Sequence, residues 1–360
     1  MNEPRIAIFA GDGIGLEVMD AAEAVLDTLE RRFGFKLARE HHPGGAAYYR
    51  ETGRELAQGG FEAARAADAI LFGAMGLPDV RLPDGTEVAP HLEMRRQFHL
   101  FAGVRPVKKY ENTPSPLGDP RAEAIDLVIL RESTEGLFAS RGKGTVENDA
   151  VARDTLEITR ATSEKLFDHA FRLAERRLAK GRGKGRVTCV DKSNVFVSMA
   201  FFRKIFDERA KAFPEIAADH AYVDAAALEL VRKPWTFDVM VMENMFGDIL
   251  SDLGGGLVGG MGMAPCAEIG TEHALFQPAH GTAPDIAGQG KANPTAMLVS
   301  SAMMLDWLGE RRGEARLVEA ADALDAAIDR AYAEAAILPF ELGGTSGTAD
   351  IARAVMDRLA

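Results

Sequence analysis

Hydrophobic positions in the first part of the chain change from a short apolar run to a helical repeat. Residues 5–10, RIAIFA, form a run typical of a buried strand and lead into the glycine turn GDGIG at 11–15. Residues 17–33 then place apolar side chains at helical spacing, and the predicted inner face holds Val18, Ala21, Ala22, Val25, Leu26 and Leu29. A strand, a glycine turn and a helix are the opening unit of an α/β fold.

The same alternation continues to the end of the chain. Apolar runs predict strands over residues 69–72, 127–131, 156–159, 186–191, 220–231 and 238–242. Helical periodicity predicts helices over residues 61–67, 164–180, 198–211, 293–309, 314–335 and 348–359. We expect one domain, residues 1–104 and 258–360, to be interrupted by a second domain over residues 105–257.

Composition narrows the class of protein. The 360 residues are 47% hydrophobic, which is enough for two sizeable cores. A net charge of −12 disfavours a general role on nucleic acid or on an anionic membrane, and no apolar run is long enough to span a bilayer. Cys189 and Cys266 form neither a disulfide framework nor a zinc motif, so a reducing cytoplasm is the expected location.

One glycine motif points to the wrong chemistry. Gly254-x-Gly256-x-x-Gly259 fits the dinucleotide fingerprint, which should follow a strand and open a helix. Here it follows a predicted helix, and no acidic residue ends a second strand about twenty residues later. We therefore reject a Rossmann site at these glycines.

The segment MVMENMFGDILSDLGGGLVG, residues 240–259, carries the first chemical signal. If GDILSD is helical, Asp248 and Asp252 lie one turn apart on one face. Two such carboxylates repel each other by about 0.2–0.5 kcal/mol, and a hard cation such as Mg²⁺ or Mn²⁺ would turn that repulsion into binding. Taken alone, the pair is more often two solvated acids on an amphipathic helix.

Other charged residues favour a binding site over a solvated helix face. Arginine binds carboxylates bidentately, and Arg95, Arg105 and Arg131 would together suit a di-acid, although each alone is more often a surface ion-pair residue. Lys192 follows a predicted strand, where burial could make it a base; the alternative is a salt-bridged lysine. Asp224 lies in an apolar run, and a buried aspartate requires a metal or a lysine as its partner.

Seven ordered motifs span nearly the whole chain. They are GDGIG, LFAGVRPVK, RESTEG, VDKSNV, YVDAAA, ENMFGDILSD and HGTAPDIAGQGKANP. Together they closely resemble the β-decarboxylating dehydrogenases, which act on isopropylmalate, isocitrate, homoisocitrate, tartrate or D-malate. The resemblance implies an α/β, isopropylmalate dehydrogenase-like two-domain fold that is not a Rossmann fold, with the second domain inserted into the first.

The resemblance also implies roles by position. Asp224, Asp248 and Asp252 resemble the Mg²⁺ or Mn²⁺ ligands, and Arg95, Arg105 and Arg131 resemble the clamp on the substrate carboxylates. Lys192 would remove the C2 hydroxyl proton while hydride leaves C2 for the nicotinamide. Family members are homodimers that share each active site, and by position Lys192 and Asp224 come from the partner subunit. Asn194 would lie beside cofactor and substrate.

The segment 280–293 resembles the family's adenosine-binding loop. The matching residues are His280, Gly281, Thr282, Ala283, Pro284, Asp285, Ile286 and Asn293. The pair Asp285-Ile286 is typical of NAD-dependent members, whereas NADP-dependent members carry Lys-Tyr. A carboxylate accepts a hydrogen bond from a ribose 2′-hydroxyl and repels a 2′-phosphate, so we expect NAD as cofactor.

Two departures from the family pattern leave the activity open. Phe138 occupies the position of the family's catalytic tyrosine, and it has no hydroxyl to protonate the enol that decarboxylation leaves. A general acid contributes about 10²–10⁴ in rate. Either water or another group such as Tyr222 replaces it, or decarboxylation is slow, or the enzyme stops at oxidation.

The second departure concerns the substrate's variable substituent. His91, four residues before Arg95, stands where isopropylmalate enzymes place leucine and isocitrate enzymes place asparagine, and Leu92 follows it. We expect an NAD- and metal-dependent oxidation and decarboxylation of a malate-type 2-hydroxy di-acid, with 3-isopropylmalate dehydrogenase as the nearest named activity. The alternatives are a tartrate- or D-malate-type dehydrogenase, and a weakly active or regulatory homologue.

Overall fold

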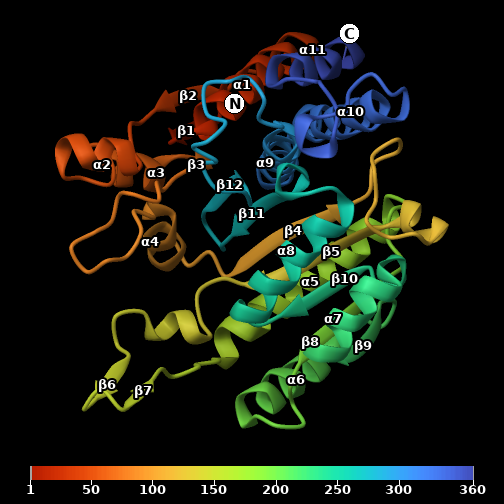
Figure 1. The fold of residues 1–360 in the computed structure, drawn as a ribbon. Helices are drawn as coiled ribbons and strands as arrows, with labels where there is room; N and C mark the ends of the chain where they lie inside the picture. Colours follow the sequence, from red (N-terminus) through yellow and green to blue (C-terminus); the bar gives the residue numbers. More distant parts are fainter. Residues whose placement is uncertain (1, 360) are drawn as a thin grey trace. The chain divides into compact units, whose positions relative to one another are not determined.

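The computed structural model describes residues 2–359, which divide into two compact units. The first unit comprises Met1–Phe98, Tyr110–Pro114 and Gly259–Ala360, and the second comprises His99–Lys109 and Ser115–Val258. The sequence pattern predicted these borders after residues 104 and 257. Each unit builds its own half of the predicted α/β pattern (Figure 1).

Five strands form the sheet of the first unit. Their order is β2-β1-β3-β12-β11; the first four are parallel, and β11 runs antiparallel to β12. The strands are β1 (Arg5–Gly11), β2 (Ala38–His41), β3 (Ala69–Ala74), β11 (Pro265–Ile269) and β12 (Ala274–Pro278). Helices α1, α9, α10 and α11 pack against one another in this unit (Figure 1). The helices are α1 (Ile14–Phe33), α2 (Ala46–Thr52), α3 (Gly60–Ala66), α4 (Pro90–Gln97), α9 (Thr295–Arg312), α10 (Ala315–Ala333) and α11 (Thr348–Leu359).

The opening unit confirms the predicted strand, glycine turn and helix. All six residues of the predicted inner face of α1 are buried. A Cβ on Gly15 would lie 2.5 Å from the Ala10 carbonyl oxygen and 2.7 Å from the Ala74 nitrogen, so the close approach of the start of α1 to β1 and β3 requires glycine there. At its other end α1 stops at Gly34, whose left-handed φ of 68° lets its N–H bond to the Glu30 carbonyl.

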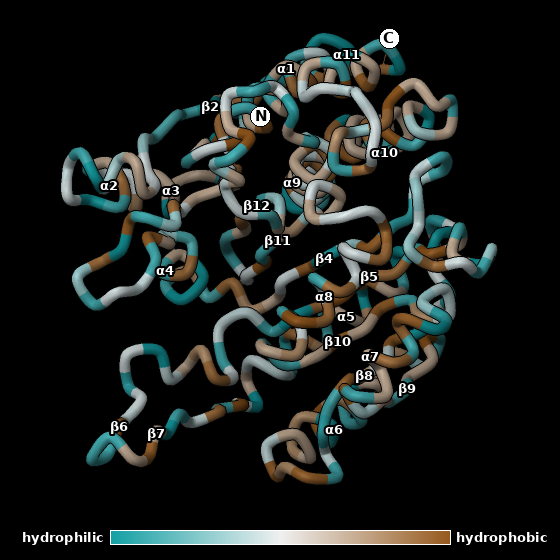
Figure 2. Tube along the Cα trace, viewed as in Figure 1, coloured by the Kyte–Doolittle hydropathy of each residue, from teal (hydrophilic) through white to brown (hydrophobic). Residues whose placement is uncertain are grey.

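Five further strands form the sheet of the second unit, in the order β4-β5-β10-β8-β9. β4 is antiparallel to β5 and the other neighbours are parallel. The strands are β4 (Ala102–Lys108), β5 (Asp126–Glu132), β8 (Arg186–Asp191), β9 (Ala217–Tyr222) and β10 (Val239–Met242), and the helices are α5 (Arg160–Ala179), α6 (Val197–Ala210), α7 (Val223–Arg232) and α8 (Asn244–Val258). All four residues of β10 are buried and apolar, as expected for a central strand (Figure 2). A separate exposed ribbon pairs β6 (Thr145–Glu147) with β7 (Val151–Arg153).

Two sequence-based strand predictions were wrong. Of residues 220–231, only the start belongs to β9, and 223–232 form α7. Ala226 and Leu230 are buried four residues apart, which is helical spacing, and the segment is rich in alanine and leucine. Residues 156–159 form no strand; Glu157 makes one isolated bridge to Gly136, and the pairing in this region lies in β6 and β7.

Two further findings bear on the expected class of protein. Cys189 and Cys266 are both free and buried. Within residues 2–359, none of the helices combines the length and the apolarity that crossing a membrane requires.

Candidate functional site

Four charged residues from β4, β5 and α8 converge in the second unit. Asp248 and Asp252 lie one turn apart on α8, which confirms the predicted helix. Arg105 of β4 places its Nη1 3.5 Å from Asp248 Oδ1 and 3.7 Å from Asp252 Oδ1. Arg131 of β5 also contacts Asp248 through its Nη1. Two guanidinium groups and two carboxylates therefore share one site.

The two kinds of charge differ in burial. Both arginines are buried, whereas both aspartates keep exposed side chains. Partial desolvation against the protein raises the pKa of Asp252, and the nearby Arg105 opposes that shift. The accessible carboxylate oxygens are hard ligands that suit Mg²⁺ or Mn²⁺. The buried guanidinium groups are fixed donors for a planar anion.

Arg131 is held by a residue that sequence reasoning missed. Asn244 Oδ1 accepts from Arg131 Nε at 3.1 Å and from Nη2 at 2.6 Å. The Asn244 Nδ2 group reaches Glu132 Oε2 at 3.4 Å. Burial raises the pKa of Glu132 to about 7, although hydrogen bonds from Thr134 and Glu135 oppose the shift. Asn244, which is itself held by Glu132, therefore fixes the plane of the Arg131 guanidinium.

Lys192 and Asp224 form a second group in this unit. Lys192 follows β8, and its Nζ lies 2.6 Å from Asp224 Oδ1 in the first turn of α7. The hydrogen bond from Lys192 lowers the pKa of Asp224. Asp224 was expected to be buried, and this was wrong, because the helix presents its side chain to solvent with 69% of it exposed. The expected lysine partner is present.

The described residues of one chain do not complete a metal site. Across residues 2–359, no group of three or more His, Cys, Asp or Glu side chains is placed to hold a metal ion. Asp248 and Asp252 offer two carboxylates on α8, and Asp224 lies with Lys192 on α7.

Four further residues were predicted to contact the substrate, namely Arg95, His91, Leu92 and Asn194. Arg95 is buried on α4 of the first unit, where its Nη2 pairs with the fully buried Glu268 at 2.6 Å. The Arg95 Nε is buried without a hydrogen-bond partner, a donor that an anionic ligand would match. His91, also on α4, packs its ring edge-on to Phe72, with 5.6 Å between ring centroids, and Leu92 follows it half-buried. Asn194 is exposed in the turn between β8 and α6.

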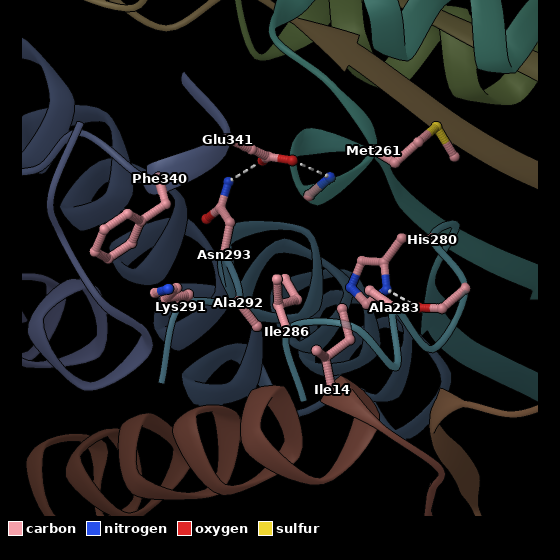
Figure 3. A pocket seen from close by; sticks show the side chains of 12 residues that line it. Ile14, Met261, His280, Ala283, Ile286, Lys291, Ala292, Asn293, Phe340 and Glu341 are labelled. Carbon is pink, nitrogen blue, oxygen red and sulfur yellow. Dashed lines mark hydrogen bonds between the residues drawn. The ribbon is translucent and has the colours of Figure 1, made fainter. Parts of the chain in front are cut away.

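A cavity of about 500 Å³ in the first unit brings together most of the predicted cofactor residues (Figure 3). The predicted residues His280, Gly281, Ala283, Ile286 and Asn293 line it, and sequence reasoning missed the other lining residues, Ile14, Met261, Gly262, Lys291, Ala292, Phe340 and Glu341. Thr282, Pro284 and Asp285 belong to the same loop but do not line the cavity, and Asp285 is exposed.

Hydrogen bonding in the cavity wall fits a nucleoside. His280 Nδ1 lies 2.8 Å from the Gly281 carbonyl oxygen, so Nδ1 carries the proton. Burial lowers the pKa of His280, which keeps the ring neutral and makes Nε2 an acceptor. Nε2 is buried without a partner. A buried acceptor beside apolar walls suits a flat ring that carries hydroxyl or amino donors.

Comparison with known proteins gives these sites a context. The chain matches the isocitrate/isopropylmalate dehydrogenase family over residues 5–355. It is 39% identical over 356 residues to the 3-isopropylmalate/3-methylmalate dehydrogenase of Methanocaldococcus jannaschii, covering 99% of this chain and 98% of that one. It is 41% identical over 365 residues to the 3-isopropylmalate dehydrogenase of Bacillus cereus, covering 99% and 97%.

Solved structures agree with the sequence comparison and confirm the predicted fold class. Isocitrate dehydrogenase from Methylococcus capsulatus superposes with a TM-score of 0.85 at 34% identity, covering 99% of both chains. A β-decarboxylating dehydrogenase from Thermococcus kodakarensis superposes with a TM-score of 0.79 at 34% identity, covering 99% of this chain and 96% of that one. This chain therefore belongs to the isocitrate/isopropylmalate dehydrogenase family.

Proposed function

We propose that this β-decarboxylating dehydrogenase oxidises and decarboxylates a malate-type 2-hydroxy di-acid with NAD and Mg²⁺ or Mn²⁺. The nearest named activity is that of 3-isopropylmalate dehydrogenase, which the relatives from M. jannaschii and B. cereus carry in their names. Family membership makes the chain an oxidoreductase. The cofactor, the metal and the substrate class are the proposed part.

The shared contacts of Arg105, Arg131, Asp248 and Asp252 carry the proposal. Both guanidinium groups contact the Asp248 carboxylate of α8. A di-acid would take the carboxylates' place on the arginines, and a divalent cation would take the arginines' place on the carboxylates. The site could therefore exchange its internal ion pairs for substrate and metal without leaving a buried charge unpaired. Arg95 is the proposed third arginine.

Lys192 is the proposed base for the C2 hydroxyl proton. Its hydrogen bond to Asp224 orients the Nζ, and binding of a cation by Asp224 would release that nitrogen to accept a proton. When bound, NAD would supply the hydride acceptor, and the divalent cation would stabilise enolate charge as CO₂ leaves.

A homodimer with shared active sites is the proposed assembly. Within the described residues of one chain, Asp224 joins no metal-binding group with Asp248 and Asp252. A second copy could supply it, together with Lys192. The same two helices expose large apolar side chains that an interface would bury, namely Leu228 and Val231 on α7 and Ile249 on α8.

The cavity in the first unit is the proposed adenosine site. His280, Ile286 and Asn293 would hold the nucleoside, and the unpartnered His280 Nε2 supports a ligand with a hydrogen-bond donor. Asp285 is the proposed reason for preferring NAD over NADP, because its carboxylate would repel a 2′-phosphate. The names of the relatives state no cofactor, so this preference rests on Asp285 alone.

Phe138 favours a second candidate, a weakly active or regulatory homologue. The Arg131 guanidinium carbon lies 5.2 Å from the centre of the Phe138 ring, so this residue adjoins the proposed substrate clamp. It offers an apolar face there and no proton. Oxidation needs no group at this position, whereas rapid protonation of the enol does.

A panel of malate derivatives tests the proposal. The panel holds 3-isopropylmalate, 3-methylmalate, isocitrate, tartrate and D-malate, each with NAD⁺ or NADP⁺ and Mn²⁺, and NAD(P)H is followed at saturating cofactor. We expect NADH from at least one derivative and its loss on treatment with EDTA. The half-buried His91 and Leu92 favour a small or hydroxylated substituent, so tartrate or D-malate could exceed 3-isopropylmalate. No NADH from any derivative would leave the regulatory homologue as the better interpretation.

A further inference from the structure

Glu341 is the one lining residue of the adenosine cavity with a carboxylate, within the part of the chain that the structure describes. It lies in the short turn Phe340–Leu342, far along the chain from the loop 280–293. Its side chain is exposed, so a ligand in the cavity can reach it. None of the seven family motifs includes this residue, and the proposed function leaves it without a role.

The cavity wall fixes the Glu341 carboxylate in place. Asn293 Nδ2 donates to its Oε1 at 2.6 Å, and the Gly262 N–H donates to its Oε2 at 3.3 Å (Figure 3). A Cβ on Gly262 would overlap Glu341 Oε1, so the missing side chain at 262 makes room for the carboxylate. Each oxygen accepts one hydrogen bond here and has lone-pair capacity for another.

The surroundings of Glu341 suit a base rather than a sugar. Ile14, Ile286, Ala292 and Phe340 give the cavity apolar walls, which fit the faces of a flat aromatic ring. The amide of Asn293 is already used, since its Oδ1 accepts from Thr295 and its Nδ2 donates to Glu341. Glu341 and His280 Nε2 therefore offer acceptors, and a ligand edge that donates hydrogen bonds complements them.

We infer that Glu341 is a specificity-determining residue that accepts a hydrogen bond from the exocyclic amine of a 6-aminopurine. The inference rests on the proposed use of this cavity for the nucleoside of the cofactor. A 6-oxopurine would place a carbonyl oxygen against the carboxylate, where two acceptors face each other without a proton. Sites built to hydrogen-bond a donor discriminate strongly against analogues that lack it.

Binding of free mononucleotides tests this inference apart from catalysis. Isothermal titration of the wild-type protein with AMP and IMP should give an affinity for AMP that is about 10- to 100-fold higher, the range for one hydrogen bond to a charged group. Glu341→Gln can donate to the 6-oxo group, so its ratio should fall to about one or invert. Glu272→Gln, at an exposed carboxylate of the same unit outside the cavity, should keep the wild-type ratio.

Two further measurements test a contact with the ribose and the proposed reaction. Glu341→Gln should leave the affinity ratio of AMP to 2′-deoxy-AMP within about twofold of wild type. A change in that ratio with no change between AMP and IMP would overturn the inference and assign Glu341 to the ribose. Equal wild-type affinities for AMP and IMP, or binding of neither, would also overturn it, and these results need no variant to fold. Discrimination without NADH from any malate derivative would support the base contact and reject the proposed reaction.

Discussion

Replacement of Asn244 by alanine should disable the proposed substrate clamp, Arg105 and Arg131, without removing a charged group. Asn244 is fully buried, and its Oδ1 accepts two hydrogen bonds from Arg131, at 3.1 and 2.6 Å. Hydrogen bonds to charged groups contribute about 1.5–3 kcal/mol each, and two bonds to one oxygen are not additive. We expect the free energy of unfolding to fall by about 2–4 kcal/mol, because Arg131, with 2% of its side chain exposed, loses two hydrogen bonds and keeps its contact with Asp248.

The kinetic consequence separates positioning from packing. Arg131 keeps its charge in Asn244→Ala but loses the partner that sets its plane. KM for the hydroxy di-acid should therefore rise about tenfold or more, because a misaligned guanidinium no longer binds a carboxylate bidentately. KM for the nicotinamide cofactor should stay near the wild-type value. Asn244→Asp retains an acceptor oxygen for Arg131 and should restore most of the substrate KM.

Asn112→Ala is the matched control for this experiment. Asn112 donates two hydrogen bonds to the Tyr332 and Ala333 carbonyls in the first unit, whereas the clamp residues belong to the second unit. It should cost about 1–2 kcal/mol of stability with no change in substrate KM. Urea denaturation gives the stability and initial rates give KM. An Asn244→Ala protein within about 0.5 kcal/mol of wild type and with unchanged KM would refute this role of Asn244.

Four further predictions follow from the same contacts. Phe138→Tyr should raise kcat, by up to about 10²–10⁴ if protonation of the enol limits turnover, and an unchanged kcat would mean that another acid serves. Glu132 has a folded-state pKa of about 7 against an ordinary value of 4.5, so its contribution to stability is complete below pH 4.5 and is lost as pH rises through 7. That loss is about 3 kcal/mol, and urea titrations across this range should show it in wild type and not in Glu132→Gln. Lys192→Ala and Asp248→Asn should each be inactive alone, and mixed dimers should regain activity if the partner supplies Lys192; no recovery after verified subunit exchange would contradict a shared site. Asp285→Lys should lower kcat/KM for NAD⁺ and raise it for NADP⁺, and an unchanged preference would show that Asp285 does not read the 2′ position.

Local patterns predicted the parts of the fold that have strong periodicity. The run RIAIFA, the glycine turn and the helix after it lie as expected, and so does the turn of α8 that stacks Asp248 on Asp252. Periodicity was misleading where apolar residues are small and dense. The segment VDAAALELVR forms α7 rather than a strand, and its helical face buries only Ala226 and Leu230. The difference placed Asp224 on an exposed helix start instead of in a core.

The residues that orient the site were beyond the reach of the sequence. Neutral or paired side chains such as Asn244 and Glu268 carry no periodic or spacing signal, because their partners lie far away along the chain. Asn244 meets Arg131 across 113 positions, and Glu268 meets Arg95 in the same way. Glu341 reaches Asn293 across 48 positions.

Simultaneous measurement of NADH and CO₂ from 3-isopropylmalate or another active malate derivative tests the central claim most directly. The reaction contains the intact protein, NAD⁺ and Mn²⁺, with ¹⁴C in the β-carboxylate of the substrate. We predict NADH formation that depends on the metal, with equal amounts of NADH and CO₂ at completion. Absence of NADH with every derivative, in a folded protein that binds Mn²⁺ and NAD⁺, would contradict the claim.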